Sequence, residues 1–419
     1  MDPPALAVGT GRLAKRLGLM FALEASTMAA YAPLLSLHAS EGLGLKPFEL
    51  ALVFAVGPLT SMIGPPIAGL LADRWVHAER ALAVGNVLRA LALCLAARAQ
   101  GFHELVVAMA LHGLFSANAG VTVNTIAFFH LPNARSFGTI RAFGTASWFT
   151  MVNVTMLYLG ARGDRHAQLA AIHDCFYVAA GVALLSALYA LTLPDTPPAR
   201  GNGGLLSALR AVTLLRSPRF AAALAVALIF GSLFQANLIF QGLFFADPHG
   251  LGLTPAAAGR ATTVSQMLEL LLFPFLGGLL NRFGLRRVVL VGVLAWPLRY
   301  AAYFAGGPTW LVVWAQLLHG VIFVLGFSGL QIAVELMAPA GLRASAQAAF
   351  ITAASGFGNL AGQLGCGALL ELTKRPGGHD WRAAFLAPLV VSFVAVGITA
   401  FGVRNSEGLH PGASPPEPT

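Results

Sequence analysis

The sequence is dominated by a recurring apolar stretch of about twenty residues, the length that an α-helix needs to cross roughly 30 Å of hydrocarbon. Glycine-rich, polar or basic segments separate one stretch from the next. The pattern predicts an all-α membrane protein with twelve transmembrane helices. These candidate spans fall near residues 16–38, 48–72, 80–99, 103–129, 138–160, 168–193, 219–244, 257–280, 287–306, 309–336, 345–372 and 382–403.

Composition agrees with a membrane setting, because 57% of the residues are hydrophobic and only 10% are charged. The net charge of +9 does not indicate nucleic-acid binding, since no stripe of Lys and Arg with interleaved aromatic residues occurs. Cys94, Cys175 and Cys366 are too scattered for a disulfide framework or a metal cluster. We therefore expect no metal, no cofactor and no nucleic-acid partner.

Lys and Arg in the loops predict the orientation of the chain. With a cytoplasmic N-terminus, fifteen of these residues fall on the cytoplasmic side and eight on the other. This satisfies the positive-inside rule and places both termini in the cytoplasm. The N-terminal segment runs into the first apolar stretch without a small-residue cleavage site, so we interpret it as a retained first helix.

The longest cytoplasmic connection divides the twelve spans six and six. We expect an N-terminal six-helix bundle at 1–193, a central cytoplasmic loop at 194–218, a C-terminal six-helix bundle at 219–404 and a disordered, Pro-rich cytoplasmic tail at 405–419. GLLADRWVHAER in the first half and GLLNRFGLRR in the second follow the same span of each half. This repetition indicates duplicated bundles around a site at the membrane midplane.

Glu269 is the only charged residue between Arg260 and Arg282, in the eighth span. A carboxylate at the centre of a bilayer costs roughly 2.5 to 3.5 kcal/mol on insertion scales, so such residues normally face a cavity and serve transport or proton relay. Gln266 lies one helical turn earlier and faces the same way. Glu24, in the first span, is a second intramembrane acid. Together they predict a polar site inside an apolar protein.

Arg89 and Arg299 lie at comparable depths in the third and ninth spans, which duplicated halves make equivalent. We expect internal ion pairs or polar networks for both residues. One alternative for Glu269 is then a structural acid that pairs with Arg299.

The loop after the second span resembles that of the major facilitator superfamily, whose signature of Gly, Asp and Arg is matched by Gly69, Asp73, Arg74 and Arg80. The resemblance implies two six-helix bundles that rock about a central site. The loop would act as a charge-assisted latch between helix ends. The alternative is that these charges only set the topology.

Seven stretches, in order along the chain, resemble the bacterial nucleoside:proton symporter family. They are ADRWVHAERA, IRAFGTASW, SALYALTLP, VSQMLE, NRFGLRRVVLVGVLAWPLRYAAYFAGGP, LRASAQ and HDW. The resemblance implies a proton-coupled transporter in the bacterial inner membrane that imports nucleosides, acts as a monomer in the lipid bilayer and is not an enzyme. Motifs for phosphate binding or hydrolysis are absent from the sequence, in agreement with this.

The resemblance also implies a substrate site. Its members in this sequence are Arg141, Thr145, Trp148, Gln235, Asn237, Gln266, Glu269, His319 and Phe323. Amide and carboxylate groups would meet the polar edges of a nucleoside, and aromatic rings its flat base. Glu269 first, and Glu24 second, would couple proton binding to substrate binding.

The sequence departs from the family pattern in the seventh and tenth spans. Leu238 replaces an Asn, with Asn237 one place earlier, His319 replaces a Tyr, and Val324 replaces an acid. The missing acid puts both substrate identity and proton coupling in question. Glu269 would have to contact substrate and carry the proton, unless Glu24 shares the work.

Several candidate residues have structural alternatives. Arg141 could extend its charge to the membrane interface, and His319 could be a hydrogen-bonded core histidine instead of a proton carrier. Trp148 and Phe323 could serve only packing or lipid contact. At the level of function, the Arg141 motif and QLLHG at 316–320 also resemble permeases for aromatic acids such as phenylpropionate, and a non-transporting receptor or scaffold is a third interpretation.

Overall fold

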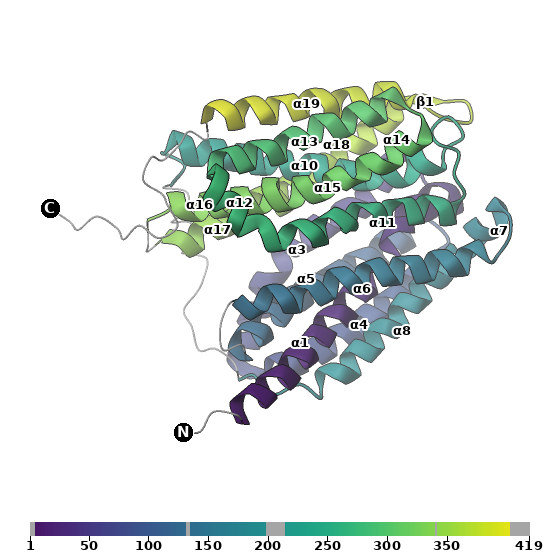
Figure 1. The fold of residues 1–419 in the computed structure, drawn as a ribbon. Coiled ribbons are helices and arrows are strands. Elements are labelled where there is room, and N and C mark those ends of the chain that lie inside the picture. The colour runs from purple at the N-terminus through teal and green to yellow at the C-terminus, as the bar shows by residue number, and fades with distance from the viewer. Residues whose placement is uncertain (1–4, 131–134, 198–213, 340–341, 403–419) are drawn as a thin grey trace. The chain divides into compact units, whose positions relative to one another are not determined.

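The computed structural model describes residues 5–130, 135–197, 214–339 and 342–402 (Figure 1). This part of the chain is mostly helical, and its β-structure is a short hairpin that pairs Lys374–Arg375 (β1) with Gly378–His379 (β2). Helices are expected because a segment inside a bilayer must satisfy its backbone hydrogen bonds internally.

The helices of the first half follow the predicted spans. Their bounds are Ala5–Ala29 (α1), Pro47–Trp75 (α3), Ala78–Arg98 (α4), Phe102–His130 (α5), Arg135–Gly160 (α6), Arg165–Ala170 (α7) and Ile172–Ala190 (α8). The first helix continues through three short segments at Ala32–Leu34 (η1), Leu35–Leu37 (α2) and His38–Gly42 (η2).

The second half contains more interruptions. Its uninterrupted helices are Pro218–Ala246 (α10), Leu285–Ala305 (α13) and Trp381–Gly402 (α19). Three other spans are broken into shorter segments. The first comprises Pro255–Leu272 (α11), Phe273–Phe275 (η3) and Leu276–Phe283 (α12), and the second comprises Thr309–Trp314 (α14), Ala315–Leu317 (η4), Leu318–Gly320 (α15), Val321–Ser328 (η5) and Gly329–Met337 (α16). The third comprises Arg343–Ile351 (α17), Thr352–Gly358 (η7) and Asn359–Leu372 (α18). η5 and η7 are π-helical, and such segments are frequent at functional sites.

Nine of the described helices are long and apolar enough to cross a membrane. A shorter apolar helix covers Pro47–Ile63, and helical segments also occupy Arg135–Gly160 and 343–372. The structure therefore confirms a predominantly helical, multi-pass architecture. The count of twelve spans stays a prediction.

The chain forms two compact units. Unit 1 comprises Met1–Asn202, Leu238–Thr263 and Gln363–His379, and unit 2 comprises Gly203–Asn237, Val264–Gly362 and Asp380–Thr419. Unit 1 thus contains two segments of the second half of the sequence. The boundaries expected for two bundles, at 1–193 and 219–404, stay a prediction. Most of the central loop and the tail at 405–419 lie outside the described residues.

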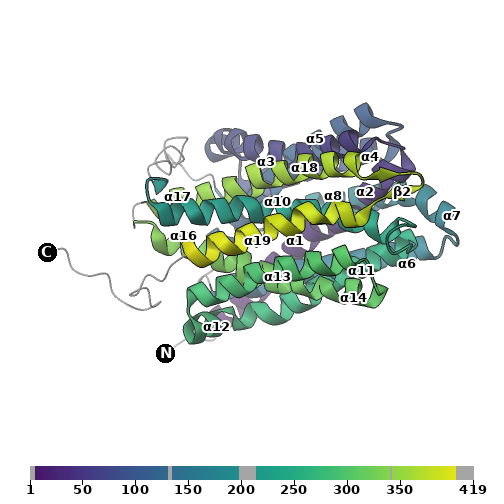
Figure 2. The same ribbon diagram turned by 90° about the horizontal axis from the view of Figure 1, so that it is seen from above.

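Each unit has an apolar core. In unit 1, α4 packs against α5 and α8, and α1 packs against α6 (Figure 1). In unit 2, α13 packs against η5 and α19, which runs alongside it (Figure 2). Large apolar side chains such as Leu157, Leu188 and Leu298 remain more than 60% exposed, as expected for faces that meet lipid.

Candidate functional site

Glu269 and His319 meet in unit 2. Glu269 lies on α11 and is 8% exposed, and its Oε2 is 3.7 Å from Nε2 of His319 on α15. A glycine makes this approach possible, since a Cβ added at Gly320 would lie 2.5 Å from the amide nitrogen of Glu269. The sequence prediction that these two residues share one site is therefore consistent with their geometry in this unit.

Arg299, on α13, contacts the same histidine from another side. Its NH1 is 3.4 Å from Nδ1 of His319, its Nε donates to the Tyr303 hydroxyl at 2.9 Å, and its NH2 donates to Oε1 of Gln316. Arg299, Tyr303 and Gln316 are completely buried. The polar network predicted for Arg299 is confirmed, and His319 connects this network to Glu269.

Aromatic rings line the other side of His319. Phe323 stacks on the imidazole with a centroid distance of 6.1 Å, and Phe234 lies 5.5 Å from it. Phe323 also stacks on Phe327 at 5.4 Å and meets Phe273 edge-on at 6.2 Å. These rings form an aromatic cluster of Phe234, Phe273, Phe323 and Phe327. Both interpretations of Phe323, as packing residue and as base-stacking residue, are compatible with this cluster.

The predicted amide residues of the second half lie on α10 and α11. Gln266 is half-buried and precedes Glu269 by three residues, so both share one face of α11. Gln235 is half-buried and directly follows Phe234 of the aromatic cluster, whereas Asn237 is only 6% exposed. Their roles as substrate ligands stay predictions.

Arg141, Thr145 and Trp148 lie on one face of α6 because they are spaced by four and three residues. Arg141 is exposed, and the other two side chains are half-buried. All three belong to unit 1, whereas Glu269 and His319 belong to unit 2. The meeting of these two groups around one substrate therefore stays a prediction.

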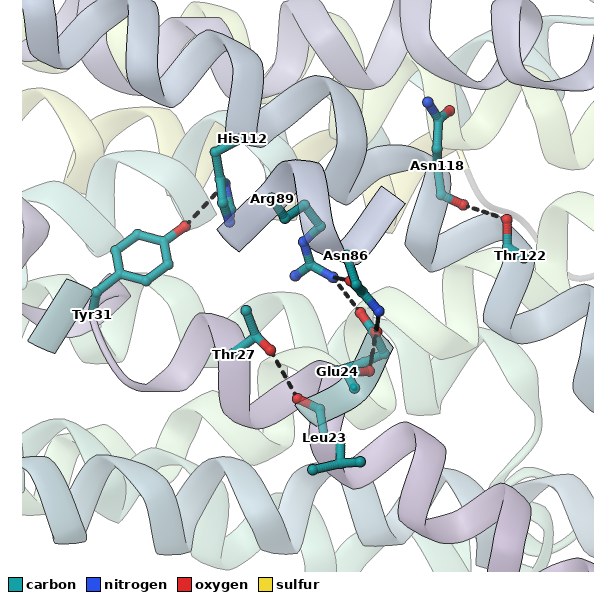
Figure 3. A network of polar contacts seen from close by, with 10 residues as sticks. Leu23, Glu24, Thr27, Tyr31, Asn86, Arg89, His112, Asn118 and Thr122 are labelled. Carbon is teal, nitrogen blue, oxygen red and sulfur yellow. Dashed lines mark hydrogen bonds and ion pairs between the residues drawn. The ribbon is translucent and has the colours of Figure 1, made fainter. Parts of the chain in front are cut away.

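Glu24 is the centre of a polar network in unit 1 (Figure 3). Its Oε2 accepts from NH1 of Arg89, and its Oε1 accepts from Nδ2 of Asn86 at 2.5 Å and from the Ser186 hydroxyl at 2.7 Å. Asn86 Oδ1 accepts from Arg89 at 2.6 Å. The internal ion pair predicted for Arg89 is confirmed. Three donors, one of them charged, match an ionised carboxylate.

Four residues of the Glu24 and Arg299 networks were not predicted from the sequence: Asn86, Ser186, Tyr303 and Gln316. A spacing signal existed for three of them, because Asn86 precedes Arg89 by three residues, Tyr303 follows Arg299 by four and Gln316 precedes His319 by three. Such neighbours share a helix face. Ser186 offered no such signal, since it reaches Glu24 from a helix 162 residues further along the chain.

The predicted gating loop is described only in part. The side chains of Asp73 and Arg74 lie outside the described residues, and Arg80 is exposed. Beside it, buried Glu79 accepts from the Thr196 amide at 2.9 Å, and Nδ1 of His77 is 2.9 Å from Asp195.

Within the described residues, one group of side chains has the geometry to hold a metal ion. The ligand atoms of His77, Glu79 and Asp195 lie within 4.8 Å of one another. The contact of His77 with Asp195 and the hydrogen bond from the Thr196 amide to Glu79 bring these side chains together.

Comparison with solved structures identifies the fold. The crystal structure of the nucleoside transporter NupG matches with a TM-score of 0.82 at 23% identity, covering 94% of this chain and 99% of that one. A bacterial homologue of the human lysosomal transporter Spinster matches with a TM-score of 0.75 at 14% identity, covering 96% and 98%. At these identities the likeness shows the fold alone, which is that of the major facilitator transporters.

Two curated proteins of Escherichia coli (strain K12) are similar in sequence. Xanthosine permease is 28% identical over 89% of this chain and 92% of its own length, and nucleoside permease NupG is 25% identical over 79% and 83%. A family profile described as nucleoside H+ symporter matches residues 12–408. Because that match covers nearly the whole chain, the protein belongs to the nucleoside H+ symporter family and is a transporter, not an enzyme.

Proposed function

We propose that this protein imports nucleosides together with protons, by alternating access to a site at the membrane midplane. Membership of the nucleoside H+ symporter family along residues 12–408 carries this proposal. Xanthosine permease and nucleoside permease NupG, both similar over most of the chain, support nucleosides as the substrate class. The family match favours nucleosides over the aromatic acids that the sequence left as an alternative.

The side chains proposed for substrate binding fit the chemistry of a nucleoside. Gln235, Gln266 and Glu269 offer amide and carboxylate groups for ribose hydroxyls and for the polar edges of the base. Trp148 and Phe323 offer ring faces for its flat surface. Arg141, Thr145, Asn237 and His319 complete the proposed set.

Glu269 is the proposed coupling carboxylate. It lies in an apolar helix of the membrane domain, is 8% exposed and has a histidine beside it. A proton on this carboxylate changes the charge of the site and hence the relative affinity for substrate in the two access states. Glu24 is a weaker candidate than its sequence suggests, because Arg89, Asn86 and Ser186 all hold its ionised form.

The proposal includes a setting and a gate. The distribution of Lys and Arg supports cytoplasmic termini, and the similarity to permeases of Escherichia coli supports a bacterial inner membrane. We propose a monomer embedded in the lipid bilayer, since the family mechanism needs one copy of the two bundles. Asp73, Arg74 and Arg80 are the proposed latch on the cytoplasmic side.

Transport by purified protein in liposomes tests the function. We expect labelled uridine or adenosine to accumulate when the outside is more acidic than the inside, and only to equilibrate without a gradient. Phenylpropionate should not accumulate. Gradient-driven accumulation of phenylpropionate but not of either nucleoside would overturn the nucleoside proposal in favour of the aromatic-acid alternative.

Glu269→Gln tests the coupling residue. This variant keeps the shape and a hydrogen-bonding amide but cannot take up the proton, so accumulation should fall to the level reached without a gradient while nucleoside exchange across the membrane continues. Glu371→Gln, which alters an exposed carboxylate at the end of α18, is the matched control and should accumulate like the parent. Full accumulation by Glu269→Gln would remove Glu269 from the coupling step.

A further inference from the structure

A Leu-His-Gly sequence occurs at the same place in both halves of the chain. Leu111–Gly113 and Leu318–Gly320 put their histidines ten residues after Phe102 and Thr309, the first residues of α5 and α14. Each glycine allows close approach to a neighbouring helix of its own half. A Cβ added at Gly113 would lie 2.5 Å from Oγ1 of Thr60, and a Cβ added at Gly320 would lie 2.5 Å from the amide nitrogen of Glu269. The two histidines are therefore repeat-related, and their surroundings can be compared directly.

Their surroundings differ in one respect that matters for proton transfer. His112 is buried, its Nδ1 is 3.4 Å from the Tyr31 hydroxyl, and Arg89 lies nearby (Figure 3). The carboxylate of that half, Glu24, is bonded to Arg89. In the second half, by contrast, the carboxylate lies beside the histidine itself, with Glu269 Oε2 at 3.7 Å from Nε2 of His319.

Arg299 determines which nitrogen of His319 carries the proton. A guanidinium has only N–H donors, so Nδ1 of His319, 3.4 Å from Arg299 NH1, can interact favourably only as an acceptor. In a neutral imidazole the proton is then on Nε2, which faces Glu269. A second ring proton would sit on Nδ1, where it would point at a donor of like charge.

The other groups around His319 do not reverse this assignment. Among the described residues, two charged groups contact it, Glu269 from α11 and Arg299 from α13. Tyr303 is titratable, but its hydroxyl accepts from Arg299 at 2.9 Å and from Gln316 at 2.5 Å. From α10 and η5, Phe234 and Phe323 face the ring with their aromatic side chains.

We propose that Arg299 holds His319 as the neutral Nε2–H tautomer, and that His319 is a positioning residue which presents this N–H to the coupling carboxylate of Glu269. The transported proton binds to Glu269 from one side of the membrane and leaves it to the other, while His319 keeps its own proton throughout. This inference rests on the proposed function for its role in transport, but the tautomer itself is a property of the protein alone.

Substitution by glutamine separates a positioning role from a proton-carrying role. In His319→Gln the amide can still accept from Arg299 and donate to Glu269, but it cannot carry a proton at any pH used for transport. We expect the pH dependence of uptake by this variant to follow that of the parent, at whatever rate it transports, and accumulation under a pH gradient to exceed the level reached without one. If His319→Gln still exchanged nucleoside across the membrane but no longer accumulated it under a pH gradient, His319 would be a proton carrier and the proposal would be overturned.

His319→Leu removes both the acceptor and the donor. Because a donor beside a carboxylate favours its charged form, we expect the pH profile of uptake to move to higher pH, by about half a unit or more. His112→Gln and His112→Leu are the matched controls in the other half and should leave the profile unchanged. An unshifted profile in a folded, transporting His319→Leu would contradict the positioning role.

Nitrogen NMR of the protein in lipid nanodiscs tests the tautomer without any transport. The protein contains 11 histidines, so the spectrum of ¹⁵N-histidine-labelled parent is compared with that of His319→Gln to identify the His319 signals. We expect a neutral ring protonated on Nε2 from pH 5.5 to 8. Titration in this range, or a proton on Nδ1, would overturn the inference even if the nucleoside proposal held. If the parent transported no nucleoside, the proposed function would fail while this measurement still decided the tautomer.

Discussion

Buried charges in this protein are stabilised by specific partners. Arg89 is 2% exposed and Arg299 is completely buried, and each donates to oxygen atoms from other helices or from its own next turn. Burying a charged group in an apolar protein is costly unless the group is paired and hydrogen-bonded. The two networks differ in their anion: Glu24 is bonded directly to Arg89, whereas His319 contacts both Arg299 and Glu269.

Glu24→Gln should destabilise the protein, because Arg89 would remain buried without its anion. Breaking one partner of a buried ion pair typically costs about 3–5 kcal/mol, which should appear as a marked loss of thermal stability in detergent. The double variant Glu24→Gln/Arg89→Gln should recover part of that loss and still accumulate nucleoside. A stable double variant that transports without coupling would instead assign the proton to Glu24.

Helices of the second half approach one another closely through glycine. A Cβ added at Gly231 on α10 would lie 1.9 Å from the carbonyl oxygen of Ala354, and one at Gly362 on α18 would lie 2.2 Å from that of Ser232. Backbone atoms cannot move aside as a flexible side chain can. The helix spacing in this region therefore depends on the absence of a side chain at these positions.

Gly362→Ala should cost roughly 1–3 kcal/mol through overpacking of α18 against α10. Gly365→Ala is the control, since it lies one turn along the same helix and a Cβ there would have no heavy atom within 4 Å. Thermal unfolding monitored in detergent compares the two. Equal stability of both variants would show that α10 and α18 can separate without cost.

At the scale of the whole molecule, unit 1 joins segments from both halves of the sequence. NH2 of Arg165 donates to both carboxylate oxygens of Glu41 at 2.7 Å, and NH1 donates to the carbonyl oxygens of Ala246 at 2.8 Å and Leu253 at 3.1 Å. Gln168 accepts from the Ala256 amide at 3.0 Å. All these residues belong to the predicted periplasmic side. Arg165 therefore connects the first half of the sequence, through Glu41, with the second half, through Ala246 and Leu253, on that side.

Arg165→Gln should weaken this connection and expose the residues it covers. Ser36 is a suitable labelling position for detecting this exposure, because its side chain is only 2% exposed in the structure. Ser36 also packs closely against the second half of the sequence, since a Cβ added at Gly242 would lie 2.5 Å from the Ser36 hydroxyl. In a background without the three native cysteines, we expect Ser36→Cys to react severalfold faster with a membrane-impermeant maleimide when Arg165 is replaced.

Arg162→Gln is the matched control for charge removal. Arg162 donates to the Tyr158 hydroxyl and pairs with Asp174 at 3.5 Å, and these residues all come from the first half. Arg162→Gln should therefore leave the rate of maleimide labelling at Ser36→Cys unchanged. Equal acceleration by both substitutions would attribute the effect to surface charge instead of the connection between halves.

Much of the fold and part of the site could be predicted from the sequence. Apolar length and helical period determine where helices form, because the bilayer dictates the length of a span and the need for internal backbone hydrogen bonds. The same periodicity placed Gln266 and Glu269 on one face. Short family motifs then identified the transporter class, which the family profile confirmed.

The partners of the buried polar groups were decided by the tertiary structure. Ser186 reaches Glu24, and Arg299 reaches His319, across helices whose neighbours cannot be read from the period of any one of them. Periodicity reveals which side of a helix is polar, but not which helix it faces or how close the two come. Those are determined by packing, as at Gly320, where the missing side chain lets His319 approach Glu269.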